Sequence, residues 1–193
     1  QLKIMRFLDS QFKKVEFDYR HWPILPSILK EDLQAKSVWY YGESGRVFRM
    51  LVSDGSLCMV LYRLMRAFRR WHLGPLAGLV YKLNAFVTGA VIGRDAQFGP
   101  GLVILHSIGV VINSSVRGGN NIVIENGVTI GAEKGKSPIL GDNIFIGAGA
   151  KILGPVKIGD NARIGANAVV IKDIPEGATA AGVPAEIVRV RED

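Results

Sequence analysis

The sequence predicts a mainly β protein in which a left-handed parallel β-helix follows a small helical domain. An aliphatic residue returns every six residues beyond Gly89, which is the period of a solenoid whose coils are built from hexads. Most of the 23 glycines lie in this second part, where closely spaced turns require them. Before residue 88 the apolar positions follow helical spacing instead. We therefore expect a helical domain at 1–88, a β-helix at 89–185 and a C-terminal tail at 186–193.

The six-residue repeat is cleanest in the last third of the chain. Successive hexads there begin at Leu140, Ile146, Ile152, Ile158, Ile164 and Val170. Upstream hexads begin at Ile92, Phe98 and Ile104 and, after a two-residue shift, at Ile112, Gly118, Ile124 and Ile130. Each hexad supplies one short strand and a turn, so three hexads close one triangular coil with the aliphatic residue inside. Gly118 stands where an aliphatic residue is expected and predicts a weak coil.

The helical domain contains three predicted helices. The first runs from a Ser27 cap to Ala35. The second covers Ser56 to Trp71, with its apolar residues on one side. The opposite side carries Arg63, Arg66, Arg69 and Arg70. We interpret this arginine side as the solvated face of a core helix, and a helix lying on a membrane surface is the alternative.

The third predicted helix begins near Pro75, because proline is accepted in a first helical turn. We expect it to pack through an apolar stripe at Leu76, Leu79, Val80, Leu83 and Val87. The apolar stretch from Leu73 to Gly93 is long enough to span a bilayer. Lys82 and Asn84 interrupt it, which favours a buried helix over a membrane span.

Composition bounds the partners of this 193-residue chain. Its net charge of +7 indicates an anionic partner, such as nucleic acid, a membrane surface or a phosphorylated cofactor. The arginines lack interleaved aromatic residues or a recognised motif, so we exclude nucleic acid. A single cysteine, Cys58, excludes a disulfide framework and indicates a reducing compartment. The start of the chain shows no secretory pattern. We predict a cytoplasmic protein and leave open a place at the inner face of the membrane.

Candidate chemistry centres on one histidine. His21 and His72 lie beside tryptophans in the helical part and are interpreted as structural. His106 lies where the two-residue shift interrupts the hexads, so its ring is expected to point outward. A neutral imidazole there can accept a proton from a hydroxyl group. A second break in the repeat, from Ala132 to Pro138, predicts an inserted loop of the kind that carries function.

The chain from Ser53 to Val188 resembles the serine acetyltransferase family and its relatives in polysaccharide synthesis, such as the colanic acid acetyltransferases. Four segments of the repeat part carry the resemblance. They are His106-Ser-Ile-Gly-Val-Val-Ile, Gly127-Val-Thr-Ile-Gly, Ile146-Gly-Ala-Gly-Ala-Lys-Ile-Leu-Gly and Gly182-Val-Pro-Ala-Glu-Ile-Val, and the helix pair from Leu57 to Phe86 matches as well.

The resemblance implies direct acetyl transfer from acetyl-CoA, used as a co-substrate without a metal, to a hydroxyl group. His106 would act as general base, and coil N–H groups would stabilise the oxyanion. Acetyl-CoA would lie in a groove between subunits of a homotrimer, and a dimer of trimers is left open. Its expected contacts are small residues at Ala132, Ala148 and Ala166 and basic residues at Lys151, Arg163, Arg189 and Arg191. Cys58 is expected to be a packed thiol.

Two departures from the family pattern concern the acceptor. Leu105 stands where serine acetyltransferases carry an aspartate before the histidine. Lys136-Ser137-Pro138 replaces their Arg-His-Pro. We expect Leu105, Lys136 and Ser137 to contact the acceptor. Without charged partners there for free serine, we predict a saccharide or polysaccharide precursor as acceptor.

Three other functions are alternatives to the predicted saccharide acetyltransferase. Serine O-acetyltransferase of cysteine biosynthesis is the first. A non-catalytic trimeric scaffold is the second, and acetyl-CoA affinity would distinguish it. A zinc hydratase of the γ-carbonic anhydrase type is the third, and it is rejected because it needs three converging histidines whereas the repeats contain only His106.

Overall fold

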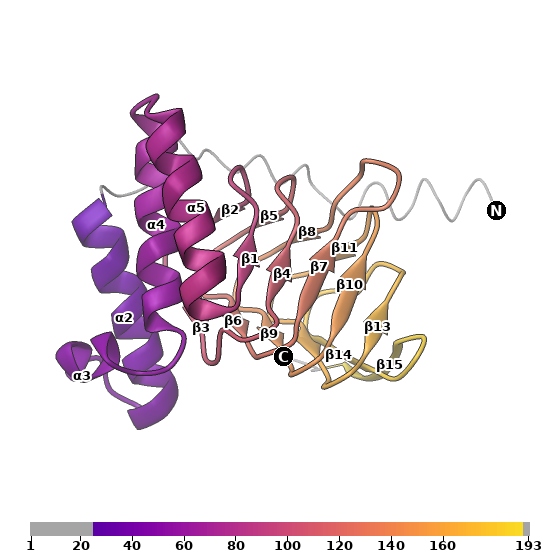
Figure 1. Cartoon of the computed structure of the whole chain (residues 1–193). Helices are drawn as coiled ribbons and strands as arrows, with labels where there is room; N and C mark the ends of the chain where they lie inside the picture. Colours follow the sequence, from indigo (N-terminus) through magenta and orange to yellow (C-terminus); the bar gives the residue numbers. More distant parts are fainter. Residues whose placement is uncertain (1–24, 191–193) are drawn as a thin grey trace.

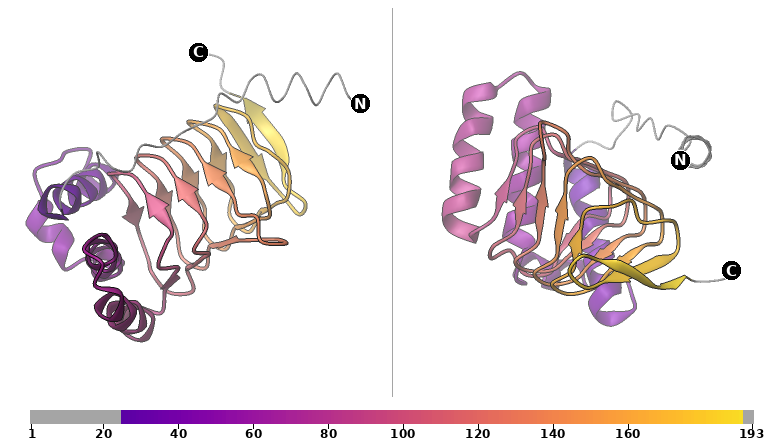
Figure 2. Two further views of the ribbon diagram at one scale, coloured as in Figure 1. Left: turned by 90° about the horizontal axis from the view of Figure 1, so that it is seen from above. Right: turned by 90° about the vertical axis from the view of Figure 1, so that its right-hand side faces the viewer.

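The computed structural model describes residues 25–190, with helices stacked against one end of a β-helix (Figures 1 and 2). The helices are α2 (Leu25–Tyr41), α3 (Val47–Leu51), α4 (Ser56–Arg70) and α5 (Gly74–Thr88). The bounds of α4 and α5 confirm the second and third predicted helices. The first extends to Tyr41 rather than ending at Ala35, and Ser27 lies inside it. His21, interpreted as structural, and Arg191, an expected contact of acetyl-CoA, lie outside the described residues.

Three sheets, parallel except for the last strand of one of them, form the faces of the predicted β-helix, and the chain visits them in turn. Sheet A contains β1 (Val91–Ile92), β4 (Val111–Ile112), β7 (Thr129–Gly131), β10 (Lys151–Leu153) and β13 (Val169–Val170). Sheet B contains β2 (Gln97–Phe98), β5 (Arg117–Gly118), β8 (Ile139–Leu140) and β11 (Lys157–Ile158). Sheet C contains β3 (Val103–Ile104), β6 (Val123–Ile124), β9 (Phe145–Ile146), β12 (Arg163–Ile164), β14 (Ala178–Ala181) and β15 (Glu186–Val190). The left-handed parallel β-helix is therefore confirmed.

The predicted tail contains strand β15, which pairs antiparallel with β14 and closes the sheet. Helices and coils share one continuous apolar core. The division of the chain at residue 88 therefore stays a prediction about domain organisation.

The first residue of each hexad points inward, as the repeat predicts. The aliphatic residues at these positions are at most 2% exposed, and each lies directly above its partner in the next coil. Gly118 does not weaken its coil, because the Phe98 ring of the preceding coil fills the space. A Cβ at residue 118 would lie 2.5 Å from Phe98 Cδ1. The large Phe98 side chain thus compensates for the side chain that Gly118 lacks.

Helix α5 does not pack as expected. Its buried residues are Ala77, Val80, Asn84 and Thr88. The predicted stripe is mostly exposed, with Leu79 at 66% and Leu76, Leu83 and Val87 between 44% and 51%. Periodicity finds an apolar stripe but does not say whether the same chain covers it. No helix among residues 25–190 is long and apolar enough to cross a membrane.

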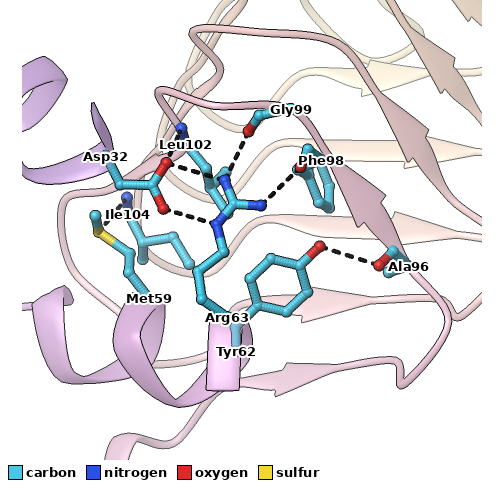
Figure 3. Close-up of polar contacts among 9 residues, drawn as sticks. All are labelled: Asp32, Met59, Tyr62, Arg63, Ala96, Phe98, Gly99, Leu102 and Ile104. Atoms are coloured by element: carbon cyan, nitrogen blue, oxygen red, sulfur yellow. Dashed lines mark hydrogen bonds and ion pairs between the residues drawn. The ribbon is translucent and has the colours of Figure 1, made fainter. Parts of the chain in front are cut away.

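The arginine side of α4 is not uniformly solvated either. Arg63 is 4% exposed and forms a two-point ion pair with the fully buried Asp32 of α2, at 2.7 and 2.9 Å (Figure 3). It also donates to the carbonyls of Phe98 and Gly99, at 2.7 and 2.6 Å. Arg69 and Arg70, in contrast, are exposed as predicted.

These contacts cap the open end of the β-helix. β3 is the edge strand of sheet C, so its peptide groups lack a partner strand on one side. Asp32 accepts a hydrogen bond from the Leu102 amide at 2.9 Å, and the Met59 sulfur lies 3.4 Å from the Ile104 amide (Figure 3). Tyr62 donates to the Ala96 carbonyl at 3.0 Å. Polar side chains of α2 and α4 thus replace a missing coil.

Candidate active site

His106 lies at a corner of the β-helix, where the chain passes from sheet C to sheet A between β3 and β4. The same corner, here called the C–A corner, is formed in later coils by residues 125–128, 147–150 and 165–168. Backbone hydrogen bonds join its layers, such as Gly127 N–H to Ile108 and Asn167 N–H to Ala148. His106 therefore lies in a continuous column of turns, at the end of the column that is next to the α-helices.

The turn that carries His106 is fixed on both sides. Leu105 N–H donates to the Ile124 carbonyl at 3.0 Å in the next coil. Ser107 Oγ donates to the Thr88 carbonyl at 2.8 Å, at the end of α5. The His106 side chain itself is 51% exposed, which confirms that the ring points outward.

Asp54, which sequence reasoning missed, faces this histidine from the turn before α4. Its Oδ2 lies 3.3 Å from His106 Nδ1. A proton on Nδ1 can be directed to this carboxylate, which leaves the Nε2 lone pair free to accept a proton. The separation is slightly longer than an ordinary hydrogen bond.

The turn of Asp54 lies tightly against the strand of His106. Gly55 adopts φ +75°, and a Cβ there would lie 2.2 Å from the Ile104 carbonyl oxygen. Only glycine combines this backbone conformation with such a close approach. The sequence analysis did not identify this turn, because nothing in the sequence links Gly55 to the distant strand that ends at Ile104.

The surroundings of the pair are acidic. Burial, followed by the nearby Glu125 and Asp54 carboxylates, raises the pKa of Tyr40. Glu125 belongs to the C–A corner of the coil after His106. Glu125 and Asp54 therefore both lie close enough to Tyr40 to act on its hydroxyl group, and two neighbouring carboxylates favour a cationic group between or beside them.

The residues predicted to bind acetyl-CoA divide between two corners. Ala148 and Ala166 lie in the same C–A column as His106, and Ala166 is exposed. Lys151 flanks this corner on sheet A, where its Nζ donates to the Gly127 carbonyl at 2.5 Å. Arg163 flanks it on sheet C, stacked 4.6 Å from the centre of the Phe145 ring.

Arg189 lies on β15 of sheet C, opposite Thr179 of β14. Ala132, by contrast, lies at the corner between sheets A and B. The sequence-predicted contacts are thus on the surface, but one chain does not gather them into one cluster.

The predicted acceptor residues are separated as well. Leu105 is next to His106 but only 3% exposed, so its side chain turns away from solvent and offers no surface to an acceptor. Lys136 and Ser137 belong to the inserted loop, at the corner between sheets A and B, where Ser137 Oγ lies 3.1 Å from Asn113 Oδ1. Within one chain, sheet A separates this loop from His106.

Cys58 is fully buried on α4, as expected for a packed thiol. Burial raises the pKa of this thiol to about 11, so the thiolate needed for nucleophilic attack is not populated at neutral pH. Among residues 25–190, no three histidine, cysteine, aspartate or glutamate side chains are grouped to hold a metal ion.

The stacked coils of hexads define the class of protein, a hexapeptide-repeat transferase. Residues 137–172 match the model of the family "Bacterial transferase hexapeptide (six repeats)". The serine acetyltransferase of Helicobacter pylori strain J99 is 38% identical over 168 residues, covering 85% of this chain and 94% of that protein.

Solved structures agree. A serine acetyltransferase in complex with CoA superposes with a TM-score of 0.80 at 32% identity, over 88% of this chain and 72% of that one. The soybean serine acetyltransferase complexed with serine gives 0.78 at 34% identity, over 85% and 69%. The chain belongs to the serine acetyltransferase family of hexapeptide-repeat transferases, and it is an acyltransferase. The predicted closeness to polysaccharide acetyltransferases gains no support from these relatives.

Proposed function

We propose that this protein is a serine O-acetyltransferase that uses acetyl-CoA and a His106 general base. The proposal replaces the saccharide acceptor expected from sequence. It is supported by relatives that carry this activity in their names, one solved with CoA and another with serine. The observation that carries it is the Asp54 carboxylate beside His106.

Asp54 removes the reason for preferring a neutral acceptor. That preference rested on Leu105 and Ser137, which provide no charge for the ammonium group of serine. The Asp54 side chain is 81% exposed, and its Oδ2 is the oxygen that lies 3.3 Å from the imidazole. An exposed carboxylate can pair with a substrate ammonium group, and Glu125 adds a second carboxylate that, like Asp54, acts on Tyr40.

Direct transfer follows from this geometry. His106 Nε2 takes the proton from the serine hydroxyl as the oxygen attacks the thioester carbonyl carbon. Asp54 stabilises the imidazolium that forms. When the tetrahedral intermediate collapses, the C–S bond breaks and the imidazolium returns its proton to the departing CoA sulfur. O-acetylserine and CoA are the products, and the histidine is regenerated.

The C–A column suits a long, narrow substrate. Beyond the turn that contains Glu125, the later turns of the column at 147–150 and 165–168 carry only glycine, alanine and one asparagine. A Cβ at Gly147 would lie 2.7 Å from the Ala166 amide, so these layers are packed as closely as backbone allows. The pantetheine arm of acetyl-CoA would run along this column, with Lys151 and Arg163 placed for its phosphates.

A homotrimer would complete the site. The inserted loop lies at the corner between sheets A and B, so it cannot serve His106 of its own chain. In a trimer the loop of one subunit would approach the C–A corner of its neighbour and bring Ala132, Lys136 and Ser137 to the groove. Lys136 would then offer an ammonium group to the carboxylate of serine.

The direct test is CoA release with purified protein, followed with a thiol reagent. Acetyl-CoA is supplied with L-serine or with a panel of mono- and oligosaccharides. We expect turnover with serine, and an Asp54→Asn variant that raises the KM for serine about tenfold or more while leaving the KM for acetyl-CoA unchanged. His72→Asn serves as the matched control, because His72 lies in the α4–α5 turn at φ 59°, which asparagine tolerates.

Turnover with a saccharide but not with serine would overturn the proposal and restore the neutral acceptor. Absence of both acetyl-CoA binding and turnover of any acceptor would argue for the scaffold alternative.

A further inference from the structure

Lys36 lies beneath the Asp54–His106 pair and has no part in the transfer chemistry. It belongs to α2, and its side chain is 0% exposed. The ammonium group donates to the Asp54 carbonyl, to Ser56 Oγ at 3.1 Å and to the Ile104 carbonyl at 2.9 Å. Its three N–H donors therefore match three acceptors, which belong to the turn before α4, the first residue of α4 and strand β3.

Capping alone does not require a lysine here. A buried ammonium group is costly unless every donor is satisfied, and an apolar side chain of similar length would fill the same volume. What an apolar side chain cannot do is hold two backbone carbonyls at a fixed separation. One of these carbonyls belongs to Asp54 itself, and the other belongs to Ile104, two residues before His106.

We propose that Lys36 is a positioning residue that holds the Asp54 carboxylate and the His106 imidazole in register. The inference rests on the proposed role of that pair in acetyl transfer. Lys36 draws the turn of Asp54 and the strand of His106 toward one point, while Gly55 permits their close approach. Releasing the turn would let Asp54 move relative to the imidazole, and misplacement by about 1 Å can cost roughly 100-fold in rate.

The electrostatics agree with this role. Burial lowers the pKa of Lys36 to about 8, against the Asp54 carboxylate and the Cys58 sulfur, which raise it. Asp54 faces Lys36 from the turn before α4, Cys58 from α4 itself, and β3 contributes only a carbonyl. The ammonium form therefore predominates at neutral pH. Above about pH 8 the amine keeps two N–H donors for three acceptors, and one contact is lost.

The test compares Lys36→Met with wild type and with Tyr62→Phe. Tyr62→Phe removes a buried hydrogen bond to the Ala96 carbonyl at the same interface, without contact to Asp54 or His106. Both variants should melt below wild type. Only Lys36→Met should lose kcat, by about tenfold or more at pH 7, with the KM for acetyl-CoA unchanged. The wild-type to Lys36→Met ratio of kcat should shrink as the pH rises above 8.

An NMR readout separates this inference from the proposed function. At fixed pH the imidazole proton shifts of His106 should change in Lys36→Met and stay unchanged in Tyr62→Phe, with His72 as internal reference. These shifts report the pair even if wild type fails to acetylate serine, which would overturn the proposed function alone. Unchanged His106 shifts together with wild-type kcat in Lys36→Met would overturn the positioning role. Equal losses of kcat in both variants would reduce Lys36 to a structural residue.

Discussion

The buried ion pair between Asp32 and Arg63 should decide whether the helical layer stays on the β-helix. Asp32→Asn changes one atom and removes one charge, so it creates no cavity. Three hydrogen bonds converge on the carboxylate, two from Arg63 and one from the Leu102 amide. The amide side chain keeps one acceptor and turns an N–H₂ group toward a guanidinium N–H. Arg63, 4% exposed, is left as an uncompensated buried charge.

Breaking one side of a buried ion pair costs about 3–5 kcal/mol. We expect Asp32→Asn to lower the free energy of unfolding by that amount, which is a large share of the total for a domain of this size. Arg63→Met should cost about as much. The double variant should cost about 2 kcal/mol less than the sum of the two single changes, because it removes both charges and leaves no unpaired charge buried.

Urea unfolding followed by far-ultraviolet circular dichroism measures these losses, at one protein concentration because assembly shifts the apparent stability. A loss below about 1 kcal/mol in Asp32→Asn would refute the argument. It would mean that water reaches the pair or that α2 separates from the coil in solution. Strict additivity of the two single changes would refute the coupling.

Three further outcomes follow from the same geometry. His106→Ala should lower kcat by about 100-fold or more and leave acetyl-CoA binding by calorimetry nearly intact; wild-type turnover would remove the histidine from the mechanism. Gly55→Ala should destabilise the fold by at least about 1–2 kcal/mol, because φ +75° is strained for alanine and the Cβ meets the Ile104 carbonyl, and kcat should fall as Asp54 moves away; a Gly55→Ala variant with wild-type melting temperature and kcat would contradict this packing. Light scattering should report a trimer or a multiple of three at micromolar concentration, and a monomer would contradict the shared groove.

The coil architecture could be predicted from sequence because it depends on local order. Each hexad repeats the same strand and turn, so one inward position in six defines the fold without any distant contact. The weak coil predicted at Gly118 shows the limit of prediction from local order. Its compensation by Phe98 joins residues that are twenty positions apart in the chain, and only the stacking of coils brings them together.

The helices show why periodicity is less informative about packing. The stripe of α5 was real but lies on the outside of the single chain, because periodicity does not identify what covers an apolar face. On α4 four arginines looked equivalent, yet Arg63 alone among them reaches the buried Asp32. Which arginine is buried depends on where α2 lies, and the sequence does not specify that.

The candidate site also contains one residue that local sequence order identified and others that it did not. His106 was recognisable because it interrupts a regular repeat. Asp54, Glu125 and Lys36 were not, because their roles arise from contacts between the helical layer and the first coils. The prediction of a neutral acceptor considered charge only at positions adjacent to His106 or in the inserted loop, and so it did not include Asp54.

The end cap and the candidate site are therefore one structure. Without the helical layer, the edge of β3 in the first coil would be exposed to solvent. Polar groups of α2 and α4 cover that edge. The same covering places the turn of Asp54 against Ile104 and so beside His106. A β-helix without its helices would keep His106 but lose the Asp54 carboxylate beside it. In the mechanism we propose, the helical layer is therefore part of the catalytic apparatus, and its stability should limit activity before the coils themselves unfold.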